Sequence, residues 1–518
     1  MPVTMPVTMP PGLETLPVEL FLRVVEQHPL TWHEPGRLPA DSWDLGTCVP
    51  SQVLGPRGIV PRKHPLLRSL SLATDPNCHI DLSSFAELRS LCWISPHPAH
   101  LRTLSAALSQ NSARLQHLEL SFGSWRRFIR NWTKHEDDDE LQRLCASRLF
   151  GLTVQSPQPI IFPAISTLSL TGVPLRVGMA DALGVNTLRS LTIRGCPGWR
   201  EFLKRVAESG LPMQLKAFQI CDRDGQDPDN GLGHTVIGDF LGAFEGLEEL
   251  FISHHGAEHA LELWRHVAHH RVTLKNFVYH RRAVSLGGDD SFSSLYPHDV
   301  PDLGILPEDM CRMEESPLKN PLAALDLNFM GLCCVPQRLK PILLPFTSKT
   351  SLKVLHIRQS TTLLKAFEVP WALSMDPLKR YGLPLASPQS GSVNPIEWAA
   401  GEADGLDSAN NTTTDRTDAD DPSSRKPNRK PKLRPEFRQF AEWVFGPHGV
   451  RSLQLLVCGN YANDDWLRQV VLERSPGGEG NGLFRDPIVG SHRPKSVEAY
   501  RDLFEVCRVV GDWDRPQG

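Results

Sequence analysis

The chain has 518 residues, of which 40% are hydrophobic and 22% are charged, and its formal net charge is −4. A sequence of this size can form several domains or one elongated repeat array, and its charge balance gives no general attraction to nucleic acid. No apolar run is long enough for an ordinary membrane-spanning helix. We therefore expect neither nucleic acid nor a membrane as a partner.

The first segment, residues 1–12, is proline-rich and is predicted to be an extended, disordered lead. It lacks the basic start and the apolar centre of a secretory signal. The 11 cysteines are odd in number and mostly lie in apolar runs, which indicates reduced, buried thiols rather than disulfides. Together these features favour a cytoplasmic location, a nuclear location, or both.

Residues 13–27 are predicted to form a short amphipathic helix. Leu16, Leu20 and Val24 are spaced by four positions and share one face, and Pro17 suits the first helical turn.

The Leu-Pro-x-Glu-Leu start of this segment resembles the first helix of an F-box, the module that docks onto the adaptor subunit of a cullin-type ubiquitin ligase. The resemblance implies that Leu16, Pro17, Glu19 and Leu20 contact the adaptor. It covers one helix only, because a proline-rich connector follows up to residue 64 and further F-box helices are not visible there. In the alternative interpretation, the helix caps the open end of the repeats that follow.

A six-residue pattern organises the middle of the chain: an apolar residue, any two residues, an apolar residue, any one residue and a further apolar residue. Its central apolar residues are Leu70, Leu91, Leu118, Leu168, Leu191, Phe218, Leu250, Phe277, Leu325, Leu355 and Leu453. Most of these centres lie 21 to 32 positions apart, and two gaps of 50 and 48 positions correspond to about two periods. This spacing indicates a repeat array.

The second and third apolar residues of each unit lie two positions apart, so in a strand they share the face that points into the core. Amphipathic segments at residues 199–209, 234–244 and 257–270 carry apolar residues at three- and four-residue steps. Alternating strands and helices predict an α/β fold in which a parallel strand ladder carries helices on its outer side. A doubly wound α/β domain is the alternative.

The units resemble leucine-rich repeats, and LRSLTIRGC, from Leu188 to Cys196, is most similar to the cysteine-containing class. The other units lack the turn cysteine, so the array is divergent. The resemblance implies an irregular leucine-rich-repeat solenoid over residues 65–382, with a further unit near Val450. A solenoid of this kind presents a concave face.

Residues 383–433 are rich in Ser, Asn, Thr, Asp, Gly and Pro and contain little that can be buried, so this linker is predicted to be disordered. Its basic end, between Arg425 and Arg434, fits either a nuclear import signal or a solvated segment that balances the preceding acidic residues.

The chain is predicted to become ordered again over residues 434–518. A helix at 434–446, a strand within VRSLQLLVCGNY and helices at 463–473 and 495–513 would close the far end of the array. This ending resembles that of many fungal F-box-like proteins.

Catalytic and cofactor-binding motifs are not present in the sequence, which has no phosphate-binding loop, nucleophile elbow, metalloprotease motif or Cys-x-x-Cys pair. We therefore expect neither enzymatic activity nor a cofactor. His255 with His259, and His266 with His270, are four positions apart. Such pairs can bind zinc or nickel on a helix, but the spacing fixes no third ligand, so exposed helical histidines are the preferred interpretation and no metal site is expected.

The residues beside the inward-pointing pairs would line the concave face. This predicted face includes Glu119, Arg194, Phe251, His280, Asp326 and Arg358, with Phe251 as an exposed aromatic anchor. Such a mixed polar surface suits recognition of a protein. Together with the F-box resemblance it implies a substrate receptor of a cullin-type ubiquitin ligase, whose partners are the adaptor subunit and a substrate protein. The alternative is a stand-alone interaction scaffold.

Overall fold

A computed structural model gives the structure of the chain and describes residues 66–74, 80–123, 138–152, 160–222, 233–255, 260–282, 303–358, 435–459, 470–475 and 495–504. Single residues between 54 and 64, Trp125, Phe128 and the pairs 373–374, 432–433, 483–484 and 488–489 are also described. The predicted F-box-like helix at 13–27 lies outside the described residues, as does the predicted linker at 383–433 apart from its last two positions.

One 13-stranded sheet runs through the molecule, and its strands follow one another in chain order. The parallel strands are β1 (Ser69–Ala73), β2 (Ser90–Ile94), β3 (His117–Ser121), β4 (Thr167–Thr171), β5 (Ser190–Arg194), β6 (Ala217–Cys221), β7 (Glu249–His255), β8 (Asn276–Arg282), β9 (Phe329–Leu332), β10 (Val354–Arg358) and β13 (Leu455–Gly459). Two antiparallel strands, β14 (Val470–Glu473) and β15 (Ile488–Val489), end the sheet. A separate antiparallel pair joins β11 (Leu373–Ser374) to β12 (Lys432–Leu433).

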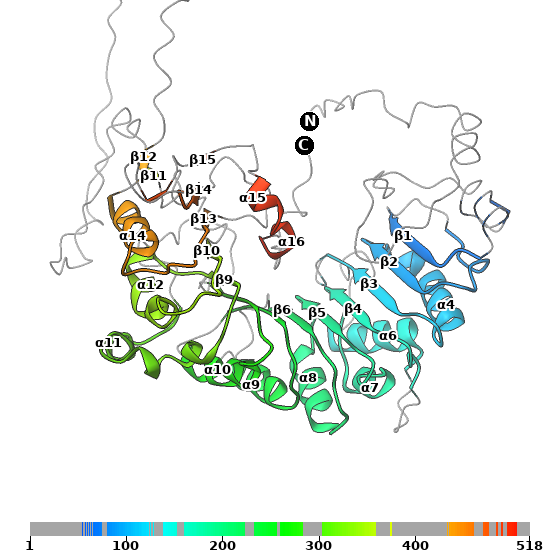
Figure 1. The fold of residues 1–518 in the computed structure, drawn as a ribbon. Coiled ribbons are helices and arrows are strands. Elements are labelled where there is room, and N and C mark those ends of the chain that lie inside the picture. Colours follow the sequence, from blue (N-terminus) through cyan, green and yellow to red (C-terminus); the bar gives the residue numbers. More distant parts are fainter. Residues whose placement is uncertain are drawn as a thin grey trace, which may run out of the picture.

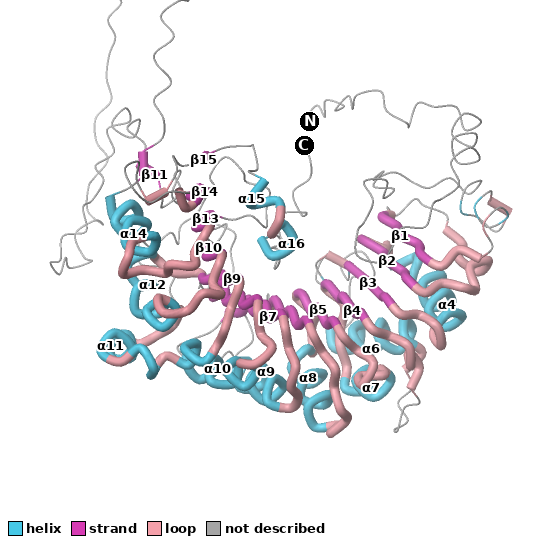
Figure 2. The backbone as a smooth tube through the Cα atoms, viewed as in Figure 1, coloured by secondary structure: helices cyan, strands magenta, loops and turns pink. Residues whose placement is uncertain are grey.

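The sheet curves, with strands along its inner side and helices along its outer side (Figures 1 and 2). The outer helices are α4 (Leu101–Asn111), α6 (Asp138–Phe150), α7 (Val177–Ala182), α8 (Trp199–Glu208), α9 (Gly233–Gly242), α10 (Ala260–Val267), α11 (Pro307–Glu315), α12 (Pro336–Leu343) and α14 (Pro435–Phe445). Two short helices, α15 (Lys495–Glu498) and α16 (Arg501–Phe504), lie inside the curve. The consecutive strand order makes the molecule solenoid-like, and the doubly wound alternative is wrong.

Short 3-10 turns complete several helix-to-strand connections. They are η2 (Pro98–His100), η3 (Ala268–His270), η5 (Pro317–Lys319), η6 (Pro321–Ala324) and η7 (Leu344–Phe346).

Helix α8 illustrates why these segments form outer helices. Trp199, Phe202, Leu203 and Val206 recur at helical spacing, and all four are buried against the sheet and the neighbouring helices α7 and α9. Gly198 precedes the helix with a φ of 73°, and a Cβ there would lie 2.3 Å from the carbonyl oxygen of Leu175. Only glycine therefore allows this close approach between successive repeats.

The core is built from two columns of apolar side chains that run from strand to strand. In one column Leu118 pairs with Leu168 of the next strand, and in the other Leu120 pairs with Leu170. All four side chains are at most 1% exposed. The predicted inward positions are therefore confirmed in β1 to β8 and in β10, because each pairs with its counterpart in the neighbouring strand.

The predicted helices at 199–209, 234–244, 257–270 and 434–446 are confirmed as α8, α9, α10 with η3, and α14, within the described residues. The predicted helix at 463–473 is wrong at its end, because residues 470–473 form strand β14. The β-branched side chains explain the difference, because Val470 and Val471 favour a strand and pair with β13.

Two predicted strand registers are wrong. The unit centred on Leu325 is not a strand, because η6 and a loop occupy residues 321–328 and strand β9 begins at Phe329. Met330 is the residue that pairs with Phe277 and Leu355, so the true unit is Leu327, Met330 and Leu332. The last unit is also misplaced, in its case by three positions, because Leu456 rather than Leu453 pairs with Leu355.

Polar side chains at the helix-to-strand turns join each repeat to the one before it. The hydroxyls of Thr187, Thr273 and Ser452 donate to the carbonyl oxygens of Ile165, Leu247 and Leu352 at 2.8, 2.7 and 2.8 Å. Each acceptor is the first apolar residue of the preceding unit, so this contact recurs with the repeat. It satisfies a carbonyl that the sheet leaves without a ladder partner.

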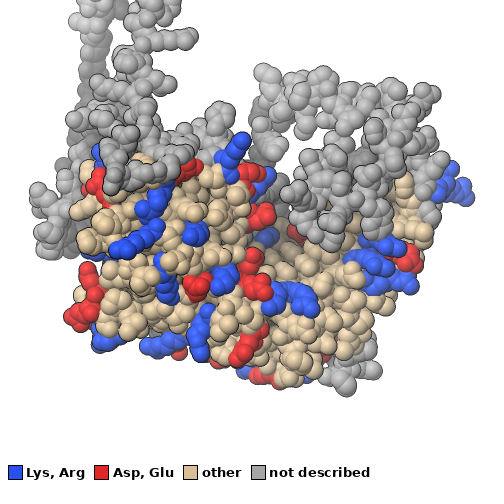
Figure 3. Space-filling view, in the orientation of Figure 1, with Lys and Arg blue, Asp and Glu red and all other residues tan. Residues whose placement is uncertain are grey.

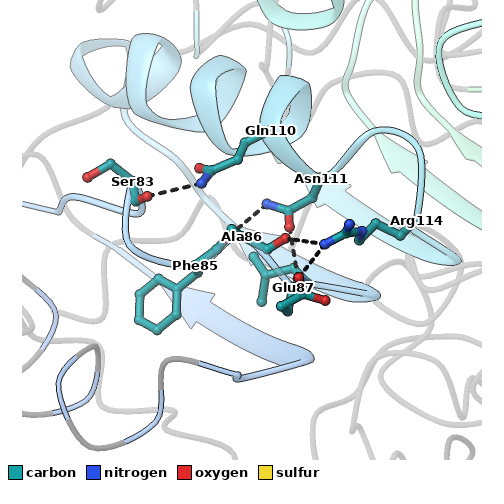
Figure 4. A network of polar contacts seen from close by, with 8 residues as sticks. Ser83, Phe85, Ala86, Glu87, Gln110, Asn111 and Arg114 are labelled. Atoms are coloured by element: carbon teal, nitrogen blue, oxygen red, sulfur yellow. Dashed lines mark hydrogen bonds and ion pairs between the residues drawn. The ribbon is translucent and has the colours of Figure 1, made fainter.

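Asn111 makes the most extensive of these turn contacts (Figure 4). Its side chain is 1% exposed. It accepts from the backbone N–H of Leu88 at 2.8 Å and donates to the carbonyl oxygens of Phe85 and Ala107, each at 2.9 Å. The neighbouring Gln110 is exposed and makes one bond, to the carbonyl of Ser83 at 3.2 Å. Asn111 therefore joins the end of α4 to the loop before β2.

We predict that Asn111→Ala lowers the free energy of unfolding by about 2–3 kcal/mol, because it leaves buried donors and acceptors of the backbone unpaired. Gln110→Ala is the matched control and should cost less than about 0.5 kcal/mol. Urea titrations followed by circular dichroism compare the two variants. Equal losses of stability in both would contradict a structural role for the Asn111 side chain.

Candidate functional site

The concave face of the sheet is the candidate functional site, because its side chains alternate with the two buried columns and point away from the core. Successive strands add residues to this face in register, as Glu119 of β3, Ser169 of β4 and Thr192 of β5 show. The concave face has two parts. They differ in their side chains and in whether α15 and α16 cover them.

The part formed by β1 to β5 is open and consists mostly of small hydroxyl side chains. These are Ser69, Ser71, Ser90, Ser121, Thr167, Ser169, Thr171, Ser190 and Thr192, and all except Thr171 are partly or fully exposed. Charged groups are interspersed: Glu119 lies beside His117 on β3, and Arg194 ends β5. Burial lowers the pKa of His117, and Glu119 partly offsets this effect. We call this part the open face.

The part formed by β7 to β14 is covered by α15 and α16. Its side chains and those of the two helices form a second apolar cluster, separate from the main core. The cluster consists of Phe251, Val278, Phe329, Val354, Leu455, Val457, Val471, Val497 and Phe504, with Tyr500 and Leu503 packed against it. We call this part the covered face. The strands beneath it are buried on both sides, as in β10 and β13.

Phe504 of α16 is the central contact with the covered face. It is 1% exposed, and its ring centroid lies 5.3 Å from that of Phe329 and 5.1 Å from that of His356, both in edge-to-face geometry. His356 Nε2 is 3.0 Å from the carbonyl oxygen of Gly459. Burial, with the charge of Arg358, holds the pKa of His356 well below its usual value. His356 is therefore neutral beneath α16.

The residues predicted for the partner-binding face fall into three groups. Glu119 and Arg194 lie on the open face. Asp326 is exposed, but it precedes β9 and pairs with Lys275 at 3.6 Å, so it is not part of the strand face. Phe251, His280 and Arg358 are on the concave side and are buried.

Phe251 is 4% exposed because it belongs to the second apolar cluster, so the expectation of an exposed aromatic anchor is wrong. His280 and Arg358 are 5% and 4% exposed, and Arg358 Nε donates to His280 Nδ1 at 3.3 Å. These two side chains interact with each other across the sheet and present little surface to a partner.

A pocket of about 270 Å³ lies where the open face meets α16. Its walls are formed by Ser190 and Thr192 of β5, Ala217, Phe218 and Gln219 of β6, Glu249 and Phe251 of β7, and Asp502 and Leu503 of α16. Strand residues and the C-terminal helix therefore build it together.

Three residues of the face and its cover, Glu249, Asp502 and Phe504, were not predicted from the sequence. One signal was available: strands β9 and β13 and the first three residues of β14 are apolar at consecutive positions, whereas β3 to β5 alternate. A continuous apolar strand indicates that both faces are covered. That signal predicts a cover over the second half of the face, although not which segment provides it.

The two histidine pairs have different outcomes. His255 lies in strand β7 and His259 lies outside the described residues, so the first pair does not share a helix. His266 in α10 and His270 in η3 lie in one helical stretch, but His270 is 2% exposed, so the expectation of an exposed helical histidine is wrong there. Among the residues that the structure describes, no group of three His, Cys, Asp or Glu side chains could hold a metal ion.

Seven of the eight described cysteines are buried, and the exception is Cys311. Burial raises the pKa of Cys145, Cys196 and Cys458 to about 12. These thiols are therefore protonated at neutral pH, which makes them packing groups rather than nucleophiles. Cys196 Sγ contacts the carbonyl oxygen of Leu170 at 3.4 Å, at the turn after β5.

The surface charges are mixed. In Figure 3 basic and acidic side chains are interspersed over the described part of the face in view. Within the described ranges, none of the helices combines the length and the apolar character needed to cross a membrane. A comparison with protein-family models and with characterised proteins finds no match to this chain.

We predict that Phe504→Ala releases α15 and α16 from the sheet, because truncating a buried phenylalanine costs about 3–5 kcal/mol. The exposed cluster should then bind a hydrophobic dye, and limited proteolysis should cut the chain between residues 495 and 504. Ala499→Ser, at an exposed position between the two helices, is the control and should behave like the parent. Loss of the whole fold, or unchanged proteolysis, would contradict this assignment.

Proposed function

We propose that this chain is a protein-recognition scaffold of the leucine-rich-repeat type, which binds its partner on the open face. The observation that carries the proposal is the division of the concave side. The covered face holds helical polypeptide from the chain itself, whereas the open face belongs to the same continuous sheet and presents partly exposed polar side chains.

The dimensions of the open face suit a protein segment. At about 4.8 Å between strands, β1 to β5 span roughly 19 Å, which is wider than a helix of about 10–12 Å. Serine and threonine side chains are short, so a partner can approach the sheet closely while the hydroxyls donate and accept hydrogen bonds. Glu119, His117 and Arg194 then add charge complementarity, which governs selectivity more than affinity.

The experiment is affinity capture with the full-length chain, followed by mass spectrometry and by binding measurements on the partner that is found. We expect Glu119→Lys to weaken the affinity for that partner by roughly tenfold, because the substitution reverses a charge in the middle of the open face. Glu208→Lys makes the same charge reversal on the outer helix α8, at an exposed position, and should leave binding unchanged.

If the two substitutions weaken the affinity for the partner equally, or if Glu208→Lys weakens it more, recognition lies on the outer helices and the proposal is refuted. Circular dichroism of both variants checks that each remains folded.

We further propose that the scaffold is a substrate receptor of a cullin-type ubiquitin ligase. The support is the Leu-Pro-x-Glu-Leu sequence at Leu16 to Leu20, which resembles the start of an F-box. In this proposal Leu16, Pro17, Glu19 and Leu20 contact the adaptor subunit, and the open face holds the substrate. A stand-alone scaffold without the ligase is the competing function.

Co-purification with the adaptor subunit separates the two functions. We expect deletion of residues 13–27 to abolish adaptor binding while capture on the open face persists. Deletion of residues 1–12, which removes the preceding segment only, should have no effect. A chain that captures its partner but never the adaptor would establish the stand-alone scaffold instead.

A further inference from the structure

We propose that the pocket between β5, β6, β7 and α16 is a subsite for one lysine or arginine side chain of a bound peptide. The inference rests on the proposed function, because it assigns a specific contact within the partner-binding face. It depends on a buried amide, two carboxylates and an aromatic wall.

Gln219 provides the buried polar group that points to a ligand. Its side chain is 7% exposed and lines the pocket. Its Oε1 accepts from Arg194 Nη2 at 3.0 Å, which fixes the amide orientation, because the reverse orientation would place two donors together. Its Nε2 is buried and has no hydrogen-bond partner among the described residues. A carbonyl oxygen of a bound peptide would satisfy this donor.

Glu249 and Asp502 provide the charge. Both line the pocket, and none of the described residues that line it with them is a lysine or arginine. Asn276 Nδ2 donates to Glu249 Oε1 at 3.0 Å, which holds that carboxylate in place. Arg194, at the end of β5, donates to Gln219 and is not among the residues that line the pocket. A cationic side chain is therefore the guest that neutralises these walls.

Size and wall chemistry narrow the guest to a single side chain. A pocket of about 270 Å³ is smaller than most small-molecule sites. Phe251 and Leu503 supply apolar contact for the methylene stem of lysine or arginine, and the aromatic ring favours a nearby cation. An apolar guest would desolvate the two carboxylates and Gln219 Nε2 without giving them a new partner, and an acidic guest would be repelled.

The test uses four probes with the full-length chain: the Nα-acetyl N-methylamides of lysine, arginine, norleucine and glutamate. Ligand-observed NMR titrations measure each affinity. We expect lysine and arginine to bind at least about tenfold more tightly than norleucine, which has a similar stem without the charge, and glutamate to show no binding. Added salt should weaken the lysine probe.

Three substitutions locate the binding. Glu249→Gln and Asp502→Asn should each weaken the affinity for the lysine probe by about tenfold, because each substitution removes one charged partner of the ammonium group. Asp502 is exposed on α16, so its variant tests the subsite with little risk to the fold. Glu208→Gln makes the same chemical change on the outer helix α8, at an exposed position, and should have no effect.

Equal binding of norleucine and lysine, or lysine binding that is unaffected by both pocket variants, would overturn the subsite. That result leaves the scaffold proposal standing if Glu119→Lys still weakens the captured partner. The reverse result, lysine bound in the pocket while no partner depends on the open face, would overturn the proposed function and retain the pocket as a cation site.

Discussion

The in-register stacking of two apolar columns is the constraint on which the rest of the structure depends. Because strand side chains alternate, burying Leu168 and Leu170 necessarily turns Thr167, Ser169 and Thr171 to the concave side. A shift of one residue in any strand would exchange the two sets. The hydroxyl contacts of the helix-to-strand turns reinforce this register, since each donor reaches a fixed position of the preceding unit. The core therefore determines the composition of the recognition surface.

The same constraint has a different outcome in the second half of the array. There several concave positions of successive strands are also apolar, so the sheet buries both faces and needs a cover. Helices α15 and α16 supply it from the C-terminal part of the chain, with Phe504 at the centre. The boundary at β6 and β7 is consequently a change in side-chain chemistry along one continuous ladder, and the pocket forms at that boundary.

Sequence reasoning succeeded where one face is polar and failed where both faces are apolar. In β3 to β5 the alternation identifies the strand and its register, and it places Glu119 and Arg194 correctly on the concave side. In β9 and β13 every position is apolar, so an earlier leucine window matched the pattern equally well and the register was misplaced. Phe251 was expected to be exposed because nothing near it in sequence reveals a cover that lies some 250 positions later. The position of Asp502 in the same pocket as Glu249 could not be predicted either, because only tertiary packing brings the two residues together.

Because α16 both covers the second half of the face and forms one wall of the pocket, two kinds of partner make opposite demands on it. A partner confined to β1 to β6 leaves α16 in place and can use Glu249 and Asp502 together. A partner that extends beyond β7 must displace Phe504 and replace its contacts with Phe329 and His356. Displacing α16 costs the free energy that docks it on the sheet. Binding beyond β7 is therefore favourable only for a partner whose apolar surface is of comparable size. Under the proposed function, the C-terminal helices therefore favour a partner that binds the polar half and ends at the pocket.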